Sequence, residues 1–193
     1  MMTSRSSSHP IHPLFIERWS PRAFDPVELS DTDIHTMIEA ARWAPSAYNI
    51  QPWRFIYCLR QDAEWDMYLS LLDPFNAAWA KNASALVFLV SDTVFQGRDT
   101  PSAYNSFDAG AAWVQLALQA TDMGYDAHAM AGILFNDVAK KLNIPDRYKV
   151  EIAIAIGQRT TPAVLPTDLQ EREAPSPRKA LSEIIFKGVF PHE

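Results

Sequence analysis

Stretches with helical and strand-like hydrophobic spacing alternate along the chain. After Ser30, apolar residues recur at helical intervals, and Ser30 with Asp33 has the pattern of a capping box, so a helix is predicted from Ser30 to before Pro45. Aromatic and β-branched residues over 53–59 and a continuous apolar run over 85–90 predict two strands. The same criteria predict short helices over 62–72 and 75–82, a long buried helix over 103–123 ending at Gly124, a strand over 125–130, a helix over 136–143 capped by Asn136, and a strand over 150–156. This order predicts an α+β or α/β fold with about four strands.

The two ends of the chain differ from this middle. Residues 1–13 are polar and Ser-rich, and we expect them to form a flexible leader. Residues 160–177 contain four prolines, which disfavour a helix or a central strand, so an extended arm is expected over about 160–193. The arm has an apolar tip around 181–186, for which a partner subunit is a fair docking candidate.

Composition narrows the class of protein. The chain has 193 residues, 48% of them hydrophobic, and this predicts one domain over 14–193 with a real core. The net charge of −6 gives no global field that would attract nucleic acid or an anionic membrane. No secretory signal and no membrane span are expected, and the single Cys58 excludes a disulfide framework and a thiolate zinc site. A cytoplasmic protein without a metal is therefore expected.

No familiar set of catalytic side chains is present. There is no H-E-x-x-H and no G-x-S-x-G, and the six glycines form neither a dinucleotide fingerprint nor a phosphate loop. Cys58 lies in a predicted strand and reads as a small buried residue rather than a nucleophile. His128 also lies in a predicted strand. A lone histidine in an apolar strand is more often a hydrogen-bonded core residue than a functional one. Either the protein is not an enzyme, or a cofactor carries the chemistry.

Cationic side chains gather at two distant places. Arg18-Trp19-Ser20-Pro21-Arg22 holds two guanidinium groups and a hydroxyl, and Arg178-Lys179 adds two more cations. The two clusters could converge on one anion, because guanidinium binds phosphate with a planar fork; they could equally be ordinary surface charges. A second unusual feature is the turn over 45–53, where hydroxyl and amide groups stand between prolines. It could read the edge of a heteroaromatic ring or be a plain connecting loop.

Taken together, these residues resemble the nitroreductase family of FMN-dependent oxidoreductases over about residues 14–187. The motifs that carry the resemblance occur in the family's order. They are Arg18-x-Ser20-x-Arg22, Ala44-Pro45-Ser46-x-x-Asn49-x-Gln51-Pro52-Trp53, Phe75-Asn76, Asp108-Ala109-Gly110, Ala131-Gly132 and Arg178-Lys179. The resemblance implies a three-layer α+β fold with a central four-stranded sheet, and a homodimer whose C-terminal arms are exchanged. Two FMN sites would lie at the dimer interface, with the long helix packed there.

The resemblance also implies a set of FMN-binding residues. The phosphate would be held by Arg18, Ser20, Arg178 and Lys179, with Trp19 between them, and Arg22 would reach the N1/O2 side of the flavin. Asn76 would meet the pyrimidine edge, and the backbone of Ala131 and Gly132, beside Met130, would face N5 and O4. Pro45, Ser46 and Ala47 of the other subunit, with Asn49 and Gln51 nearby, would lie against the ring. Two positions depart from the common family pattern: Trp79 stands where many members have a basic residue, and Ala131 where an acidic one is frequent.

The implied activity is hydride transfer from NAD(P)H through flavin N5 to a nitroaromatic, quinone or similar conjugated acceptor. It requires no protein acid, base or nucleophile, which agrees with the missing catalytic set. Two alternatives remain open at the level of sequence: a non-catalytic flavin-binding, storage or sensor protein, and a structural dimer that binds no flavin.

Overall fold

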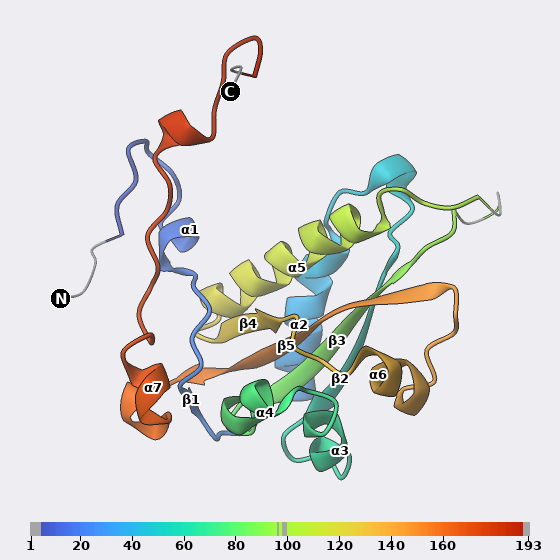
Figure 1. The fold of residues 1–193 in the computed structure, drawn as a ribbon, viewed down its shortest axis with the longest axis vertical. Coiled ribbons are helices and arrows are strands. Elements are labelled where there is room, and N and C mark those ends of the chain that lie inside the picture. Colours follow the sequence, from blue (N-terminus) through green and yellow to red (C-terminus); the bar gives the residue numbers. More distant parts are fainter. Residues whose placement is uncertain (1–4, 96, 98–99, 191–193) are drawn as a thin grey trace.

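Five strands form one sheet, and all their pairings are antiparallel (Figure 1). The computed structural model describes residues 5–95, 97 and 100–190. The strands are β1 (Phe24–Asp25), β2 (Trp53–Leu59), β3 (Ala85–Asp92), β4 (Asp126–Met130) and β5 (Tyr148–Arg159). β5 is the longest strand; it pairs with β3, with β4 and, at its end, with β1. The expected four strands are therefore joined by a fifth of only two residues, which is too short to leave a hydrophobic pattern.

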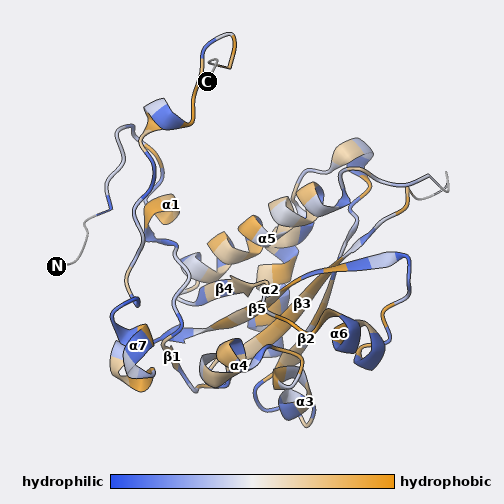
Figure 2. Ribbon diagram, in the orientation of Figure 1, coloured by the Kyte–Doolittle hydropathy of each residue, from blue (hydrophilic) through white to orange (hydrophobic). Residues whose placement is uncertain are grey.

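Helices cover both faces of the sheet and give it three layers. Alternate residues of β3 point to opposite faces, as the strand period requires. Leu86 and Phe88 pack with α3 (Trp65–Leu69), α4 (Pro74–Ala80) and α6 (Phe135–Lys141), whereas Val87 and Leu89 pack with α2 (Asp31–Arg42) and α5 (Asn105–Asp122). The apolar colouring of Figure 2 follows the strands and the helix sides that meet them. This architecture confirms the predicted three-layer α+β fold.

Most predicted boundaries agree with the structure, and two helices depart from them. Ser30 caps α2 by accepting a 3.1 Å hydrogen bond from the Asp33 backbone N–H, and Gly124 follows α5 with a φ of +82°. The helix expected over 62–72 shortens to α3, because Asp62 accepts a bond from the Leu59 N–H and forms a turn. α6 begins at Phe135, so Asn136 lies inside it rather than at its cap.

The entry to α6 is fixed by contacts that the sequence does not display. The backbone N–H of Leu134 donates a 2.9 Å hydrogen bond to the carbonyl of Leu71, and Leu72 forms an isolated bridge with Ile133. A tertiary backbone contact thus fixes where α6 begins, and α6 has no side-chain cap from the described residues.

The C-terminal segment is less extended than its prolines suggest. A short helix, α7 (Thr167–Gln170), follows Pro166, a position that proline tolerates because the first N–H groups of a helix are unpaired anyway. Leu165 and Leu169 are buried in the core. Only after residue 173 does the chain leave the domain as an arm, beside α1 (Leu14–Glu17) and the chain that precedes it (Figure 1). In the described ranges, no helix has the length and apolarity needed to cross a bilayer.

Candidate functional site

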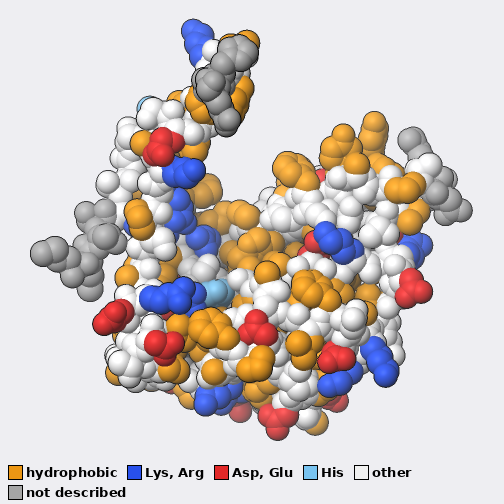
Figure 3. Space-filling model, viewed as in Figure 1, with side chains coloured by type: hydrophobic (Ala, Val, Ile, Leu, Met, Phe, Trp, Pro, Cys, Tyr) orange, Lys and Arg blue, Asp and Glu red, His pale blue; other side chains and the backbone are white. Residues whose placement is uncertain are grey.

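A cavity of about 220 Å³ lies where both ends of the chain meet β4. Its lining includes five arginines and one histidine: Arg5, Arg18, Arg22, Arg172, Arg178 and His128. Trp19, Ser20, Ala174 and Ser176 complete it. Figure 3 shows Lys and Arg side chains along the inner side of the arm, next to a pale blue His, at the edge of the hollow between arm and domain. Two clusters that are more than 150 positions apart in the sequence therefore share one site.

The Arg18–Arg22 segment is held in place by the end of β5 and the residues after it. One carboxylate oxygen of Glu173 accepts hydrogen bonds from the backbone N–H groups of Arg22 (2.6 Å) and Ala23 (2.8 Å). The backbone N–H of Thr160 donates to the Ala23 carbonyl at 2.9 Å, next to the pairing of β1 with β5. The loop that carries the cations is thus tied to the sheet and to the segment that follows β5.

Positive charge in the cavity is only partly neutralised. Arg22 lies 3.8 Å from Glu173, whereas Arg18 donates to the hydroxyl of Ser20 (3.4 Å) and Arg178 to the carbonyls of Ser176 and Pro177, and within the described residues neither donates to a carboxylate. Burial, then the neighbouring Arg178, lower the pKa of Arg18. A group of guanidiniums that repel one another in a partly buried cavity is suited to an anion with several acceptor oxygens.

His128 forms the floor of the cavity as a neutral group. Its Nδ1 lies 2.8 Å from the carbonyl oxygen of Pro21, and since a carbonyl only accepts, Nδ1 carries the proton. Its ring packs on the buried Trp79 ring at 4.8 Å between centroids. Burial, with Arg22 and Arg18 contributing, lowers the pKa of His128 to about 4. Proximity in space, rather than any sequence motif, brings this residue into the site.

A second group of predicted residues meets at the end of β4. The side-chain amide of Asn76 donates a 3.0 Å hydrogen bond to the carbonyl of Gly132, and the Asp73 backbone N–H donates to the same oxygen at 3.1 Å. Met130 is buried and shares with His128 the sheet face that carries Trp79. A Cβ on Gly132 would lie 1.7 Å from a side-chain oxygen of Asp73, so any larger residue here would force Asp73 to move.

The turn over 45–53 is strained and densely bonded. Tyr48, Asn49 and Gln51 all have φ near +55°, a region that non-glycine residues rarely adopt. The turn is held by the Ser46 hydroxyl, which accepts from the Gln51 N–H (2.9 Å), and by the buried Asp108, which accepts from the Ala47 N–H (3.1 Å). Backbone strain of this kind is a frequent mark of functional segments.

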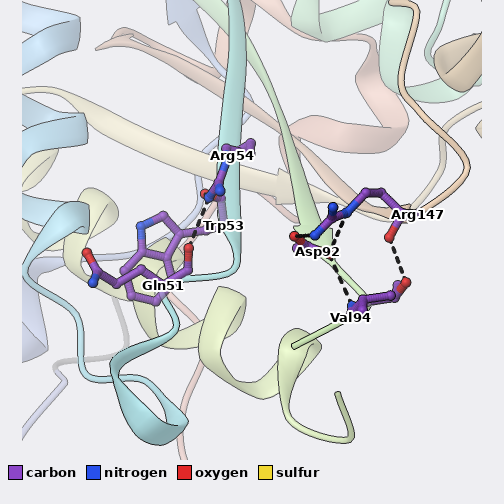
Figure 4. Close-up of polar contacts among 7 residues, drawn as sticks. Gln51, Trp53, Arg54, Asp92, Val94 and Arg147 are labelled. Carbon is purple, nitrogen blue, oxygen red and sulfur yellow. Dashed lines mark hydrogen bonds and ion pairs between the residues drawn. The ribbon is translucent and has the colours of Figure 1, made fainter. Parts of the chain in front are cut away.

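Further contacts fasten this turn to the sheet (Figure 4). Arg54 donates to the carbonyls of Gln51 (3.0 Å) and Trp53 (2.7 Å). The Asp92 backbone N–H donates to the carbonyl of Pro52 at 2.9 Å, and the Asp92 carboxylate is paired with Arg147. The turn is thus rigid on the side of the sheet, while the Tyr48 side chain is exposed.

The structure places the predicted site residues in three groups. The cavity contains Arg18, Trp19, Ser20, Arg22 and Arg178, but Lys179 is not among its lining residues. The end of β4 brings together Asn76, Met130, Ala131 and Gly132, and the strained turn carries Pro45, Ser46, Ala47, Asn49 and Gln51. The sequence reasoning missed Arg5 and Arg172, which stand in polar segments without a motif, and left the role of His128 open. Cys58 is buried, and burial raises the pKa of its thiol to about 12, in agreement with the expectation of a small buried residue.

Comparison with known proteins identifies the family. Residues 16–86 and 59–158 match the model described as "Nitroreductase family". The chain belongs to the nitroreductase family. A solved structure described as "The crystal structure of the oxidoreductase containing FMN" is 46% identical, with a TM-score of 0.95 and complete coverage of both chains.

Two of the curated relatives of this nitroreductase-family chain are an enone reductase and a nitroreductase. The "CLA biosynthesis enone reductase" of Lactiplantibacillus plantarum is 29% identical over 182 residues, which span 75% of this chain and 83% of the relative. The "Oxygen-insensitive NADPH nitroreductase" of Helicobacter pylori is 37% identical over 79 residues, or 40% of this chain and 37% of the relative.

Replacing Gly132 by alanine is expected to destabilise the turn after β4. The new Cβ would clash with Asp73, whose other oxygen caps α4 by accepting from the Asn76 N–H at 2.8 Å. We expect the free energy of unfolding to fall by about 1–3 kcal/mol, as for other overpacked sites. Urea denaturation measures it. Ala131→Ser, next in the chain at an exposed position, is the matched control and should stay within about 0.5 kcal/mol of wild type.

The neutral His128 predicts a loss of stability in acid. Its pKa is about 4 in the fold, against an ordinary value of 6.5, so the unfolded chain binds more protons between these values and the fold weakens as pH falls through them. The contribution is on the order of 2 kcal/mol. Urea denaturation from pH 7 to pH 4 should show a smaller fall for His128→Gln than for wild type. Equal falls would contradict the prediction; His9→Gln, at an exposed residue, is the control.

Proposed function

We propose that the protein is an FMN-dependent oxidoreductase that takes a hydride from NAD(P)H and passes it to a conjugated acceptor such as a nitroaromatic, a quinone or an enone. The observation that carries the proposal is the arginine cavity. Five arginines and no carboxylate residue are among its lining residues in the described part of the chain. The family, the FMN named for the 46% identical oxidoreductase, and the NADPH and enone named for the curated relatives support it.

The residues of the cavity fit the phosphate of FMN. A phosphate monoester carries close to two negative charges and three strong acceptor oxygens, and planar guanidinium forks bind such groups in pairs. Arg18, Arg178 and the Ser20 hydroxyl supply donors of this kind, and Arg18 and Arg178 have no carboxylate hydrogen-bonded to them within the described ranges. Trp19 also lines the cavity, and its buried indole N–H has no acceptor in the described part of the protein.

The remaining site residues would position the flavin ring. Bound flavin supplies the chemistry of hydride acceptance from NAD(P)H and hydride donation to the acceptor. Arg22 would place its positive charge at the N1/O2 edge, where charge develops on reduction. The backbone at Ala131 and Gly132 would approach N5 and O4, and Asn76, which holds that backbone through the Gly132 carbonyl, would border the pyrimidine. Lys179 would add a cation near the phosphate.

We also infer a homodimer in which the arm of each chain packs on the other. Large apolar side chains are exposed in two places. Phe107 of α5 is 79% exposed and lies on the same side of the sheet as Trp43 (71%), while the arm exposes Ile184, Ile185 and Phe186. Patches of this kind mark interaction sites. In the dimer, the turn with Pro45, Ser46 and Ala47 would face the partner's flavin.

The free, buried Cys58 is compatible with a reducing, cytoplasmic location.

Anaerobic reduction tests the proposed activity. The purified protein, reconstituted with FMN, is mixed with NADH or NADPH, and the flavin absorbance near 450 nm is followed. We expect bleaching with at least one nicotinamide and its reversal by a quinone, nitroaromatic or enone. Failure to bind FMN would overturn the proposal. Binding without bleaching would support a flavin-storage or sensor protein instead.

Arg18→Ala tests the phosphate cavity directly. The substitution removes a charge-assisted bond worth about 1.5–3 kcal/mol, so the dissociation constant for FMN should rise by roughly 10- to 100-fold. Quenching of flavin fluorescence measures it. Arg42→Ala is the control, because Arg42 is exposed on α2 and pairs with Glu39 outside the cavity. An unchanged affinity for FMN in Arg18→Ala would contradict the assignment of the cavity.

A further inference from the structure

Arg5 ties three separate segments together at the mouth of the arginine cavity. Its Nη1 donates to the carbonyls of Ile16 and Arg18, both at 2.8 Å, and its Nε donates to the carbonyl of Ser176 at 3.1 Å. The first two carbonyls belong to α1 and the loop after it, and the third belongs to the arm. The segment that the sequence predicts to be a loose leader therefore carries a residue that joins the arm to the Arg18 loop. Figure 1 shows the chain before α1 running beside the arm.

These contacts hold Arg5 without neutralising it. All three acceptors are uncharged carbonyls, and among residues 5–95, 97 and 100–190 no carboxylate forms an ion pair with it. Burial, then Arg178 and Arg18, lower the pKa of Arg5, which places it in the same electrostatic environment as the other cations of the cavity. The Arg5 side chain is held by hydrogen bonds to carbonyl oxygens, and its positive charge remains available to attract an anion.

The geometry of the guanidinium leaves one donor group for a ligand. An arginine has five N–H donors: one on Nε and two on each terminal nitrogen. Nε and Nη1 are bonded to carbonyls, whereas no acceptor in the described part of the chain is bonded to Nη2. Because Arg5 lines the cavity, Nη2 is the group through which it can contact an anion there.

We propose that Arg5 is a further binding residue for the FMN phosphate: it fastens the arm to the Arg18 loop and offers its Nη2 donors and its positive charge to the phosphate. This inference rests on the proposed function. It assigns a part in cofactor binding to a residue outside the motifs of the family resemblance. It also assigns a role to residues 5–13, because this segment places the Arg5 guanidinium at the cavity.

Comparison of two flavins tests the inference. FMN and riboflavin share the ring and the ribityl chain, and only FMN carries the phosphate. We expect Arg5→Ala to raise the dissociation constant for FMN by about tenfold or more, the loss of one charge-assisted bond, and to change that for riboflavin by less than about threefold. The selectivity for FMN over riboflavin should therefore fall. Flavin fluorescence gives both constants on the full chain.

The control is another arginine that also donates to backbone carbonyls. Arg60 donates to the carbonyls of Lys81 and Ala83 and is not part of the cavity, so Arg60→Ala should leave the selectivity for FMN unchanged. If Arg5→Ala does not fold, Arg5→Lys makes the same test, because it keeps the charge but cannot reach all three carbonyls; a smaller, still FMN-selective loss is expected.

An unchanged selectivity in the Arg5 variant, whether both affinities fall together or neither does, would overturn the inference. A wild-type protein that binds neither flavin would instead overturn the proposed function, so the two failures are distinguishable.

Discussion

The candidate site depends on the contact between the carboxylate of Glu173 and the backbone of the Arg18–Arg22 loop. The carboxylate accepts two short hydrogen bonds from consecutive backbone N–H groups, those of Arg22 and Ala23, and is buried as it does so. An anion that accepts several N–H groups is strongly held, and a buried one is costly to leave without partners. Through this contact the residues after β5 fix the loop that carries Arg18, Ser20 and Arg22. Together with the bond from the Thr160 N–H to the Ala23 carbonyl, this contact sets the position of the loop.

The cavity places like charges close together, and this has a thermodynamic cost. Arg178 lies near enough to disfavour the charged forms of Arg5 and Arg18, and burial adds to the effect. The fold tolerates the repulsion because carbonyl oxygens of residues 16, 18, 176 and 177 support two of the guanidiniums. An anion that binds here relieves the repulsion, so binding and folding stability are linked. A site of this kind gains affinity because its cations are already gathered when the ligand arrives.

Local patterns were sufficient for most of the fold. Ser30 and Asp33 marked the start of α2, the apolar run marked β3, and Gly124 marked the end of α5, since each of these signals acts within a few residues. Two of the failures have a different cause. β1 exists because it pairs with β5, and α6 begins where Leu134 bonds to Leu71 rather than where Asn136 could cap it. Such long-range contacts are invisible to periodicity.

The same distinction applies to the site. The arginines at 18, 22 and 178 were noticed as two clusters, and their convergence was one of two readings that the sequence left open. Only the folded chain shows that Arg5 and His128 share their cavity, because neither belongs to a motif and their neighbours are distant in sequence. The resemblance to a family named the residues of the turn and of the β4 end. It did not reveal the strain at Tyr48, Asn49 and Gln51, which depends on backbone geometry.

The cavity draws its walls from the first and last parts of the chain, and this sets the order in which the molecule is completed during synthesis. The sheet has all its strands once Arg159 is available. The cavity must wait for Glu173 to fix the loop and for Ser176 and Arg178 to close the other side. Chains fold from the N-terminus as they emerge. A nascent chain can therefore build its core first, and it gains the ability to retain an anion only after residue 178 has been synthesised.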